Sequence, residues 1–248
     1  MKHKMTLLAL ALAPLAAFAA EDAEDGKLWT GEANLSYIDS SGNTESTNLA
    51  FRSGATRDGE DWRNIYKLEA SNETAEQEDE NGNKEEVRTA EKYFASAKAE
   101  YKFGEKSYFF GLLEYTDDRF SGFDYEASVT FGYGRDILNT EAHELSADAG
   151  VGYRESKVSE TGDVVEEAVL RLGALYLWRI SDTAPFDEDF STEIGEEKTV
   201  TKSYTRLKVK INGSLHGFVA YEIKHTDEVP EGTKNSDRKF MVGLNYSF

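Results

Sequence analysis

The sequence contains no cysteine, only three prolines and, beyond its first twenty residues, no apolar run long enough to span a bilayer as an α-helix. Without cysteine there is no disulfide framework, no thiolate metal site and no lipid-modified cysteine. The few prolines leave no proline-rich linker that would mark a boundary between two domains. Basic residues are also scarce, with 28 Lys and Arg against 47 Asp and Glu and a formal net charge of −19. Such a surface repels nucleic acid, so we expect no nucleic-acid partner.

The amino terminus has the pattern of a cleaved secretory signal peptide. Lys2 and Lys4 are basic, residues 5–16 are apolar, and residues 17–19 form an Ala-Phe-Ala cleavage motif. The apolar segment is too short for a membrane-spanning helix. We therefore expect a signal peptide at residues 1–19 and a single mature domain at residues 20–248.

The carboxyl terminus alternates strictly between two kinds of residue. Counting back from Phe248, every second residue is apolar, namely Phe248, Tyr246, Leu244, Val242 and Phe240. A period of two is what a wall with lipid outside and a polar lumen inside requires. A terminal Phe on such a strand resembles the signal by which the outer-membrane assembly machinery takes up its substrates. Phe248 and Tyr246 are therefore the candidate assembly signal, and the expected partners are that machinery, outer-membrane lipid and lipopolysaccharide.

The same period predicts twelve strands and hence an all-β fold, a transmembrane antiparallel up-and-down β-barrel. The expected strands are residues 29–39, 46–57, 61–72, 87–103, 106–117, 122–135, 142–155, 166–180, 184–195, 200–212, 214–226 and 236–248. Long connections such as 73–86, 155–165 and 226–235 alternate with tight ones such as 58–60, 104–105 and 212–213. This asymmetry and the terminal Phe favour a barrel over a soluble β-sandwich. An even strand number places the protein in the outer membrane with both termini in the periplasm.

The inward-facing positions carry charged residues of both signs. The candidate lumen network consists of Arg171, Arg179, Asp187, Asp189, Glu193, Arg206, Lys208 and Lys210. Asp187, Asp189 and Glu193 can face the row of Arg206, Lys208 and Lys210 on the next strand, which predicts a cross-strand ion-pair network. The alternative is a selectivity filter, although an anion-selective pore calls for basic residues in excess rather than in balance.

Inward glycines gather on three consecutive predicted strands, which leaves one side of the lumen without side chains. They are Gly132, Gly134, Gly150, Gly152 and Gly173. Either this wall borders a narrow water-filled path, or long side chains from the far wall (Lys239, Met241 and Arg52) fill the space. Glycine also relieves strain where barrel strands curve.

Acidic residues crowd the expected loop 73–86, where Lys84 is the only base. A run of like charges is usually a solvated loop, and the sharper hypothesis is weak capture of divalent cations at the cell surface. The spacing of Asp79, Asn81 and Asn83 partly resembles a calcium loop, but Lys84 occupies the glycine position and the closing Glu is misplaced. We therefore predict no dedicated metal site and no cofactor.

An enzyme is the competing class, because some barrels hydrolyse lipid or peptide with a Ser-His pair or acids beside His. The only histidines of the mature chain are His143, His216 and His225, and no serine stands at a sequence spacing from His225 that would indicate a catalytic pair. Asp227 and Glu228 adjoin His225, which leaves a metal or acid–base pairing open there. Metal-ligand spacing, a GxSxG motif and a phosphate loop are all absent from the sequence. We expect no enzymatic activity.

Three segments of the sequence carry a family resemblance. They are the opening strand Leu-Trp-Thr-Gly-Glu-Ala-Asn-Leu-Ser-Tyr at 28–37, the turn Ser-Gly-Asn-Thr-Glu-Ser at 41–46 and the closing Leu-Asn-Tyr-Ser-Phe at 244–248. They resemble the salt-induced outer-membrane protein family, a domain of unknown function in Gram-negative bacteria. The resemblance spans the mature chain and implies a barrel linked to salt or osmotic conditions. It implies no catalytic or binding residues.

These observations predict a passive role for the protein, either as a narrow pore or as an envelope component used under osmotic stress. Small solutes or divalent cations are the expected ligands. The alternatives are a surface receptor or cation-binding structural barrel and, in third place, an outer-membrane hydrolase.

Overall fold

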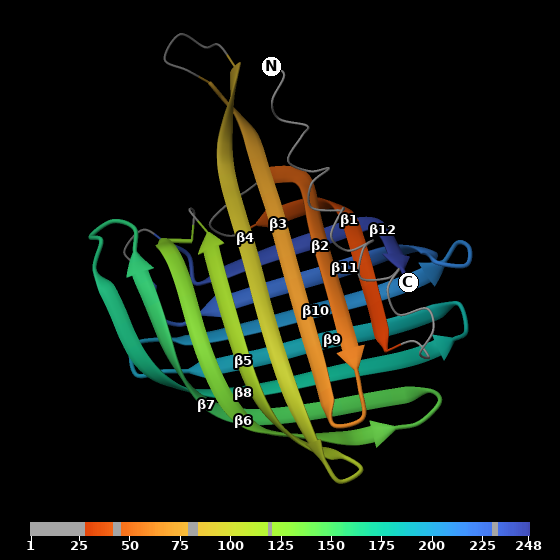
Figure 1. Cartoon of the computed structure of the whole chain (residues 1–248). Coiled ribbons are helices and arrows are strands. Elements are labelled where there is room, and N and C mark those ends of the chain that lie inside the picture. Colours follow the sequence, from red (N-terminus) through yellow and green to blue (C-terminus); the bar gives the residue numbers. More distant parts are fainter. Residues whose placement is uncertain (1–27, 42–45, 79–83, 119–120, 230–232) are drawn as a thin grey trace.

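The protein is a closed, twelve-stranded antiparallel β-barrel (Figure 1). The computed structural model describes residues 28–41, 46–78, 84–118, 121–229 and 233–248. The strands are β1 (Trp29–Ser41), β2 (Ser46–Asp58), β3 (Trp62–Glu78), β4 (Lys84–Phe103), β5 (Ser107–Asp118), β6 (Phe123–Asn139), β7 (His143–Val158), β8 (Val164–Ser181), β9 (Ala184–Ile194), β10 (Thr199–Lys210), β11 (Leu215–Thr226) and β12 (Ser236–Ser247). Each strand pairs with its sequence neighbours, and β1 pairs with β12. The predicted fold class and strand count are confirmed.

The barrel closes beside the chain terminus. The backbone N–H of Gly31 donates to the carbonyl oxygen of Phe248 at 3.1 Å, and the N–H of Phe248 donates back to Gly31 at 3.0 Å. A Cβ on Gly31 would lie 2.6 Å from Cε2 of the Phe248 ring, so glycine is needed where the ring crosses β1. Tyr246 is 53% exposed on the outer wall. We call this end of the barrel the terminal end and the opposite end the distal end.

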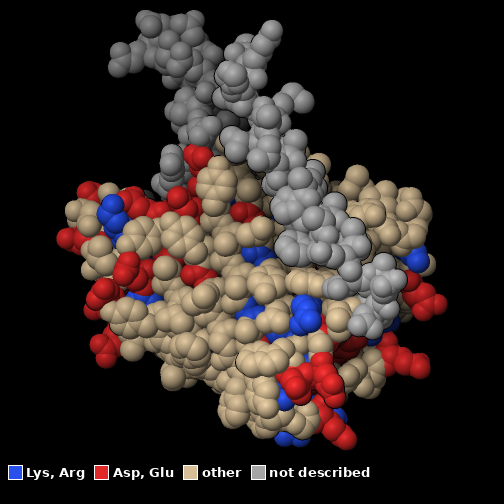
Figure 2. Space-filling model, in the orientation of Figure 1, with Lys and Arg blue, Asp and Glu red and all other residues tan. Residues whose placement is uncertain are grey.

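The two faces of the wall have the polarity expected of a membrane barrel. Large apolar side chains on the outer face are exposed, including Leu113, Phe131 and Val151, whereas Asn34, Thr130 and Asn245 are buried inside. On the face that Figure 2 shows, uncharged side chains form a broad surface and most charged side chains gather toward its edges. Covering the outer face with hydrocarbon removes this apolar surface from water. Among the described residues, no helix is long and apolar enough to cross a membrane.

The sequence predicted a loop at residues 73–86, and this prediction is wrong because strands continue into both ends of the segment. β3 continues to Glu78 and β4 starts at Lys84, and the two strands stay paired with a bulge between Glu73 and Thr74. Backbone pairing needs no apolar side chains, so a hairpin can continue through an acidic segment. The Asp79–Asn83 spacing and the signal peptide at residues 1–19 lie outside the described residues.

Candidate functional site: the charged lumen

One predicted ion pair lies directly across neighbouring strands. Arg206 and Asp187 are opposite residues in the β9–β10 register, and their Nε and Oδ2 atoms are 3.0 Å apart. Arg206 also reaches Glu32 of β1 at 2.9 Å. Lys208 lies 3.5 Å from Glu32 and 3.7 Å from Asp187. The structure therefore brings this part of the predicted row together.

The rest of the predicted row does not pair as expected. Asp189 is bound by Lys67 of β3, and Glu193 lies 3.3 Å from Arg154 of β7. Lys210 is exposed, and its backbone N–H donates to the carbonyl oxygen of Thr183 at 2.8 Å, so that a threonine and not an acid lies beside it on the neighbouring chain segment. Side chains this long reach across the lumen as easily as along the wall, so the β9–β10 register alone does not choose their partners.

The two remaining arginines of the predicted network behave differently from each other. Arg171 lies inside the lumen, where its Nη1 donates to Asp148 at 2.7 Å. Arg179 is 42% exposed at the terminal rim, where it pairs with Glu144 and donates to the carbonyl oxygen of Glu141 at 3.1 Å. Arg179 therefore belongs to the rim and not to the interior network.

The Lys67–Asp189 contact, called here the central pair, joins opposite walls of the barrel. β3 and β9 are separated by five strands in either direction around the closed sheet. The two side chains remain 39% and 37% exposed, although both face inward. The central pair therefore crosses a part of the lumen that admits water.

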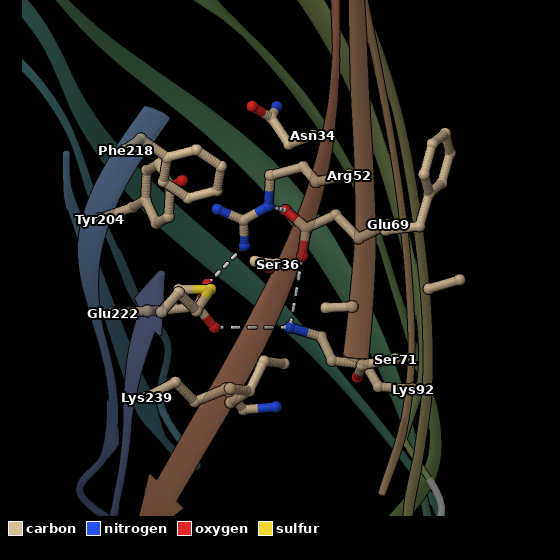
Figure 3. Close-up of a pocket in the computed structure, with 15 residues that line it drawn as sticks. Asn34, Ser36, Arg52, Glu69, Ser71, Lys92, Tyr204, Phe218, Glu222 and Lys239 are labelled. Carbon is tan, nitrogen blue, oxygen red and sulfur yellow. Dashed lines mark hydrogen bonds and ion pairs between the residues drawn. The ribbon is translucent and has the colours of Figure 1, made fainter. Parts of the chain in front are cut away.

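Four further charges form a closed ring of alternating sign, which we call the quartet (Figure 3). Arg52 contacts Glu69 at 2.9 Å and Glu222 at 2.5 Å. Lys92 lies 3.7 Å from Glu69 and 3.8 Å from Glu222, which completes the ring. The Arg52 guanidinium also lies 4.1 Å from the centroid of the Tyr204 ring. The quartet borders a cavity of about 30 Å³, and a cavity needs only about 10–15 Å³ to hold a water molecule.

A second group, the distal cluster, consists of Glu126, Arg154, Glu167 and Lys198. Arg154 and Glu167 are 2% and 3% exposed and lie 2.6 Å apart. Lys198, in the turn between β9 and β10, is 5% exposed and lies 2.6 Å from Glu126.

The distal cluster also anchors the backbone of the β9–β10 turn. Arg154 donates to the carbonyl oxygen of Lys198 at 2.6 Å, and the N–H of Glu197 donates to Glu167 at 2.9 Å. The ammonium of Lys198 lies 3.4 Å from the centroid of the Phe123 ring. Burial lowers the pKa of Lys198, and its pairing with Glu126 opposes that effect. The turn is thus tied down at the distal mouth of the lumen.

Neighbouring side chains crowd the five glycines that were predicted to leave one wall open. A Cβ on Gly132 or Gly150 would lie 2.7 Å or 3.0 Å from the Phe110 ring, and one on Gly134 would overlap the ring of Tyr108. Gly152 is crowded by Thr130, and Gly173 by Asp148 and Arg171. The space is therefore occupied by side chains of the same side of the barrel, and not by Lys239, Met241 or Arg52 of the far wall.

Tyr108 and Phe110, both buried, were missed by the sequence analysis. The segment Tyr108-Phe109-Phe110 is apolar on both faces, which hides the alternation of β5. The signal that could have found them is the neighbouring run of inward glycines, since aromatic rings often cover glycine on an adjacent strand. Lys98 lies 4.8 Å from the centroid of the Phe110 ring and links this aromatic layer to Asp148 at 2.8 Å.

Two of the histidines, His143 and His225, have side-chain partners that the sequence did not indicate. His225 and Ser236 are opposite residues of β11 and β12, and His225 Nδ1 lies 2.8 Å from Ser236 Oγ. His143 Nδ1 lies 2.9 Å from the hydroxyl of Tyr176. Within the described parts of the chain, no three His, Asp or Glu side chains converge as a metal site would require.

Comparisons with known proteins agree with this architecture. The family described as "Protein of unknown function, DUF481" matches residues 33–248. The uncharacterized protein YdiY of Escherichia coli (strain K12) is 30% identical over 222 residues, which cover 89% of this chain and 84% of YdiY.

Two solved structures are similar in fold. The NanC porin has a TM-score of 0.55 at 10% identity and covers 86% of this chain and 98% of its own. The translocator domain of the autotransporter NalP from Neisseria meningitidis has a TM-score of 0.51 at 13% identity, with 98% and 96% covered. At these identities the likeness establishes the outer-membrane β-barrel fold. The match to the family model over most of the chain shows that this protein belongs to the DUF481 family.

Proposed function

We propose that the protein is a narrow passive pore for small inorganic ions in the outer membrane of Gram-negative bacteria, with both termini in the periplasm. The observation that carries the proposal is the central pair. Lys67 and Asp189 meet from opposite walls, yet more than a third of each side chain is exposed. A hydrated ion pair, unlike an apolar plug, is a barrier that a permeating ion can replace with its own charge.

The link to salt conditions follows from the same pair. Exposed ion pairs are screened by salt, with a Debye length that falls from about 10 Å at 0.1 M to about 3 Å at 1 M. Screening weakens the contact that crosses the lumen. Conductance is therefore expected to rise with salt concentration more steeply than the conductivity of the solution.

Single-channel recording in a planar bilayer tests this proposal. Lys67→Gln removes the positive charge of the central pair and should make the pore more cation-selective, whereas Asp189→Asn removes its negative charge and should make the pore more anion-selective. The double variant should conduct more than wild type with little change in selectivity. Arg179→Gln, which breaks an exposed pair at the terminal rim, is the matched control and should leave the reversal potential unchanged. Silence of wild type and all variants up to 1 M salt would contradict the pore.

A closed structural or receptor barrel is the second candidate, and the distal cluster favours it. Arg154, Glu167 and Lys198 are almost fully buried at the distal mouth. This candidate predicts silence in the bilayer together with weak calcium binding by the acidic hairpin, which isothermal titration would detect. Neither candidate includes a catalytic step, and we assign the His225–Ser236 contact to cross-strand pairing.

A further inference from the structure

The membrane-facing surface of β9 and β10 carries a carboxylate and several hydroxyl groups. Glu188 lies near the middle of β9, and it shares the outward phase of Phe186 and Phe190. Its neighbours Asp187 and Asp189 pair with bases inside the lumen. The Glu188 carboxylate therefore lies on the surface that hydrocarbon covers in the outer membrane.

Four hydroxyl residues accompany Glu188 on this surface. Ser203 of β10 donates to its carboxylate at 2.7 Å, and Thr205, the residue opposite Glu188, donates to the second oxygen. Thr192 and Thr201 are also opposite residues, and their hydroxyl oxygens are 3.0 Å apart. Only one of these two O–H groups is used in that contact. We call these five residues the polar strip.

Hydrocarbon is an unfavourable environment for the polar strip. β9 and β10 are described in full, and none of their outward positions carries a Lys or Arg that could neutralise Glu188. A carboxylate can accept about four hydrogen bonds, and the hydroxyls of Ser203 and Thr205 supply two. Lipid tails offer no donor, so an ionisable residue at this depth marks a contact with another polar group. The polar strip is therefore better placed against protein than against lipid.

The shape of this part of the barrel leaves room for another barrel. The polar strip lies on the side opposite β3 and β4, whose ribbon rises past the rest of the barrel (Figure 1). β9 and β10 are shorter, with 11 and 12 residues against 17 and 20 in β3 and β4. Arg154 and Glu167 hold the turn between β9 and β10 from inside. Because Ser and Thr side chains are short, a second wall can approach this one closely.

We propose that the polar strip is the interface between two copies of this protein in the outer membrane. Copies with the same orientation are related by a two-fold axis along the membrane normal, which would run between β9 and β10. Each Glu188 then faces the β10 hydroxyl row of the other copy, and the two carboxylates stay on opposite sides of the axis. A second copy brings a polar strip at the same depth, whereas a partner of another sequence would need a matching strip of its own. Both strips leave the lipid in one contact.

The chain has no cysteine, so a single introduced cysteine reports on one position of the wall. Phe190→Cys lies beside the proposed axis and leaves the polar strip intact. Leu68→Cys, at an outward position of β3, is the matched control, because the native side chains are 39% and 50% exposed. The full-length mature protein is oxidised with copper phenanthroline in lipid vesicles at a low ratio of protein to lipid. Phe190→Cys should form a disulfide-linked dimer at least tenfold faster than Leu68→Cys. Equal rates, or no dimer from either variant, would overturn the interface.

Further substitutions in the Phe190→Cys protein test the chemistry of the contact. Glu188→Met, Ser203→Ala and Thr205→Val together make the strip apolar at similar or smaller volume and should slow cross-linking at least tenfold. Glu188→Gln keeps hydrogen bonding, removes the like charge and should cross-link at least as fast as its parent. Heat-dependent mobility on a gel shows that each variant is folded. Undiminished cross-linking of the triple variant would overturn the polar strip as the contact. Neither readout requires conduction, so a silent protein that cross-links through the strip would contradict only the pore.

Discussion

The distal cluster and the central pair both join opposite charges inside the barrel, yet their surroundings differ. Arg154 and Glu167 are 2% and 3% exposed and also hold the backbone of a turn, whereas Lys67 and Asp189 are 39% and 37% exposed and bind each other across the lumen. Breaking a buried ion pair leaves a charge without compensation, while an exposed pair exchanges its partner for water at little cost. We therefore expect the distal cluster to contribute more to stability than the central pair, which in the proposed pore would act on permeating ions.

The largest expected effect comes from Arg154→Gln, which strips Glu167 and the carbonyl oxygen of Lys198 of their buried donor. Removing one partner of a buried pair costs about 3–5 kcal/mol, so the free energy of unfolding should fall by that amount. Urea unfolding in lipid vesicles, followed by tryptophan fluorescence, measures it. Arg179→Gln should change stability little, and an equal loss in the two variants would remove the distinction between buried and exposed pairs.

Gly134→Ala should have the next largest effect, because it tests whether packing as well as charge stabilises the interior of the barrel. The added methyl group would overlap the ring of Tyr108, and overpacking of this kind costs about 1–3 kcal/mol. The double variant Gly134→Ala/Tyr108→Ala should lose less stability than the sum of the losses in the two single variants. Gly213→Ala, where the new Cβ meets nothing within 4 Å, is the control for the backbone effect of glycine. Additive losses in the double variant would contradict the contact.

Lys67→Gln is expected to change stability by only about 0–1 kcal/mol, since both partners remain partly hydrated. The same variant should clearly shift the reversal potential of the proposed pore. Lys67→Gln is therefore expected to change selectivity without changing stability. Unfolding in vesicles would measure its stability, and bilayer recording on the same preparation would measure its selectivity. A loss as large as that of Arg154→Gln would place the central pair among the structural contacts.

Asp227, beside the β9–β10 turn, should give the smallest effect. Partial burial alone would raise the pKa of Asp227, but hydrogen bonds from the backbone N–H groups of Thr199 and Glu228 lower it below its ordinary value. A lowered carboxyl pKa contributes stability above the unfolded value of 3.8 that is lost as the pH falls through the folded value. The difference in stability between wild type and Asp227→Asn should therefore shrink below about pH 4. A constant difference from pH 7 to pH 3 would contradict this role.

The sequence predicted the fold because strand phase and turn length are local properties. Strict alternation up to Phe248 and the succession of short and long connections determine the number of strands, and the Arg206–Asp187 pair follows from the register of neighbouring strands. Partners across the lumen are not local. Asp189 meets Lys67 and Glu193 meets Arg154 because of the tilt and stagger of the whole barrel, which no single strand encodes. The surroundings of the inward glycines were missed for a related reason. Tyr108 and Phe110, which cover these glycines, lie on β5, where apolar residues on both faces hide the alternation.

The hairpin of β3 and β4 has a consequence for contacts between molecules. Among the described residues, β2 pairs with β3 as far as Asn72 and β5 pairs with β4 from Lys92, whereas β3 and β4 continue to pair with each other beyond these positions. The ribbon rises past the rest of the barrel, as Figure 1 shows. A strand edge that extends past its neighbours in a sheet is the usual template for strand addition by another polypeptide. The ribbon's many acidic residues repel an identical ribbon, so these edges stay available to a chain of opposite charge and resist self-association.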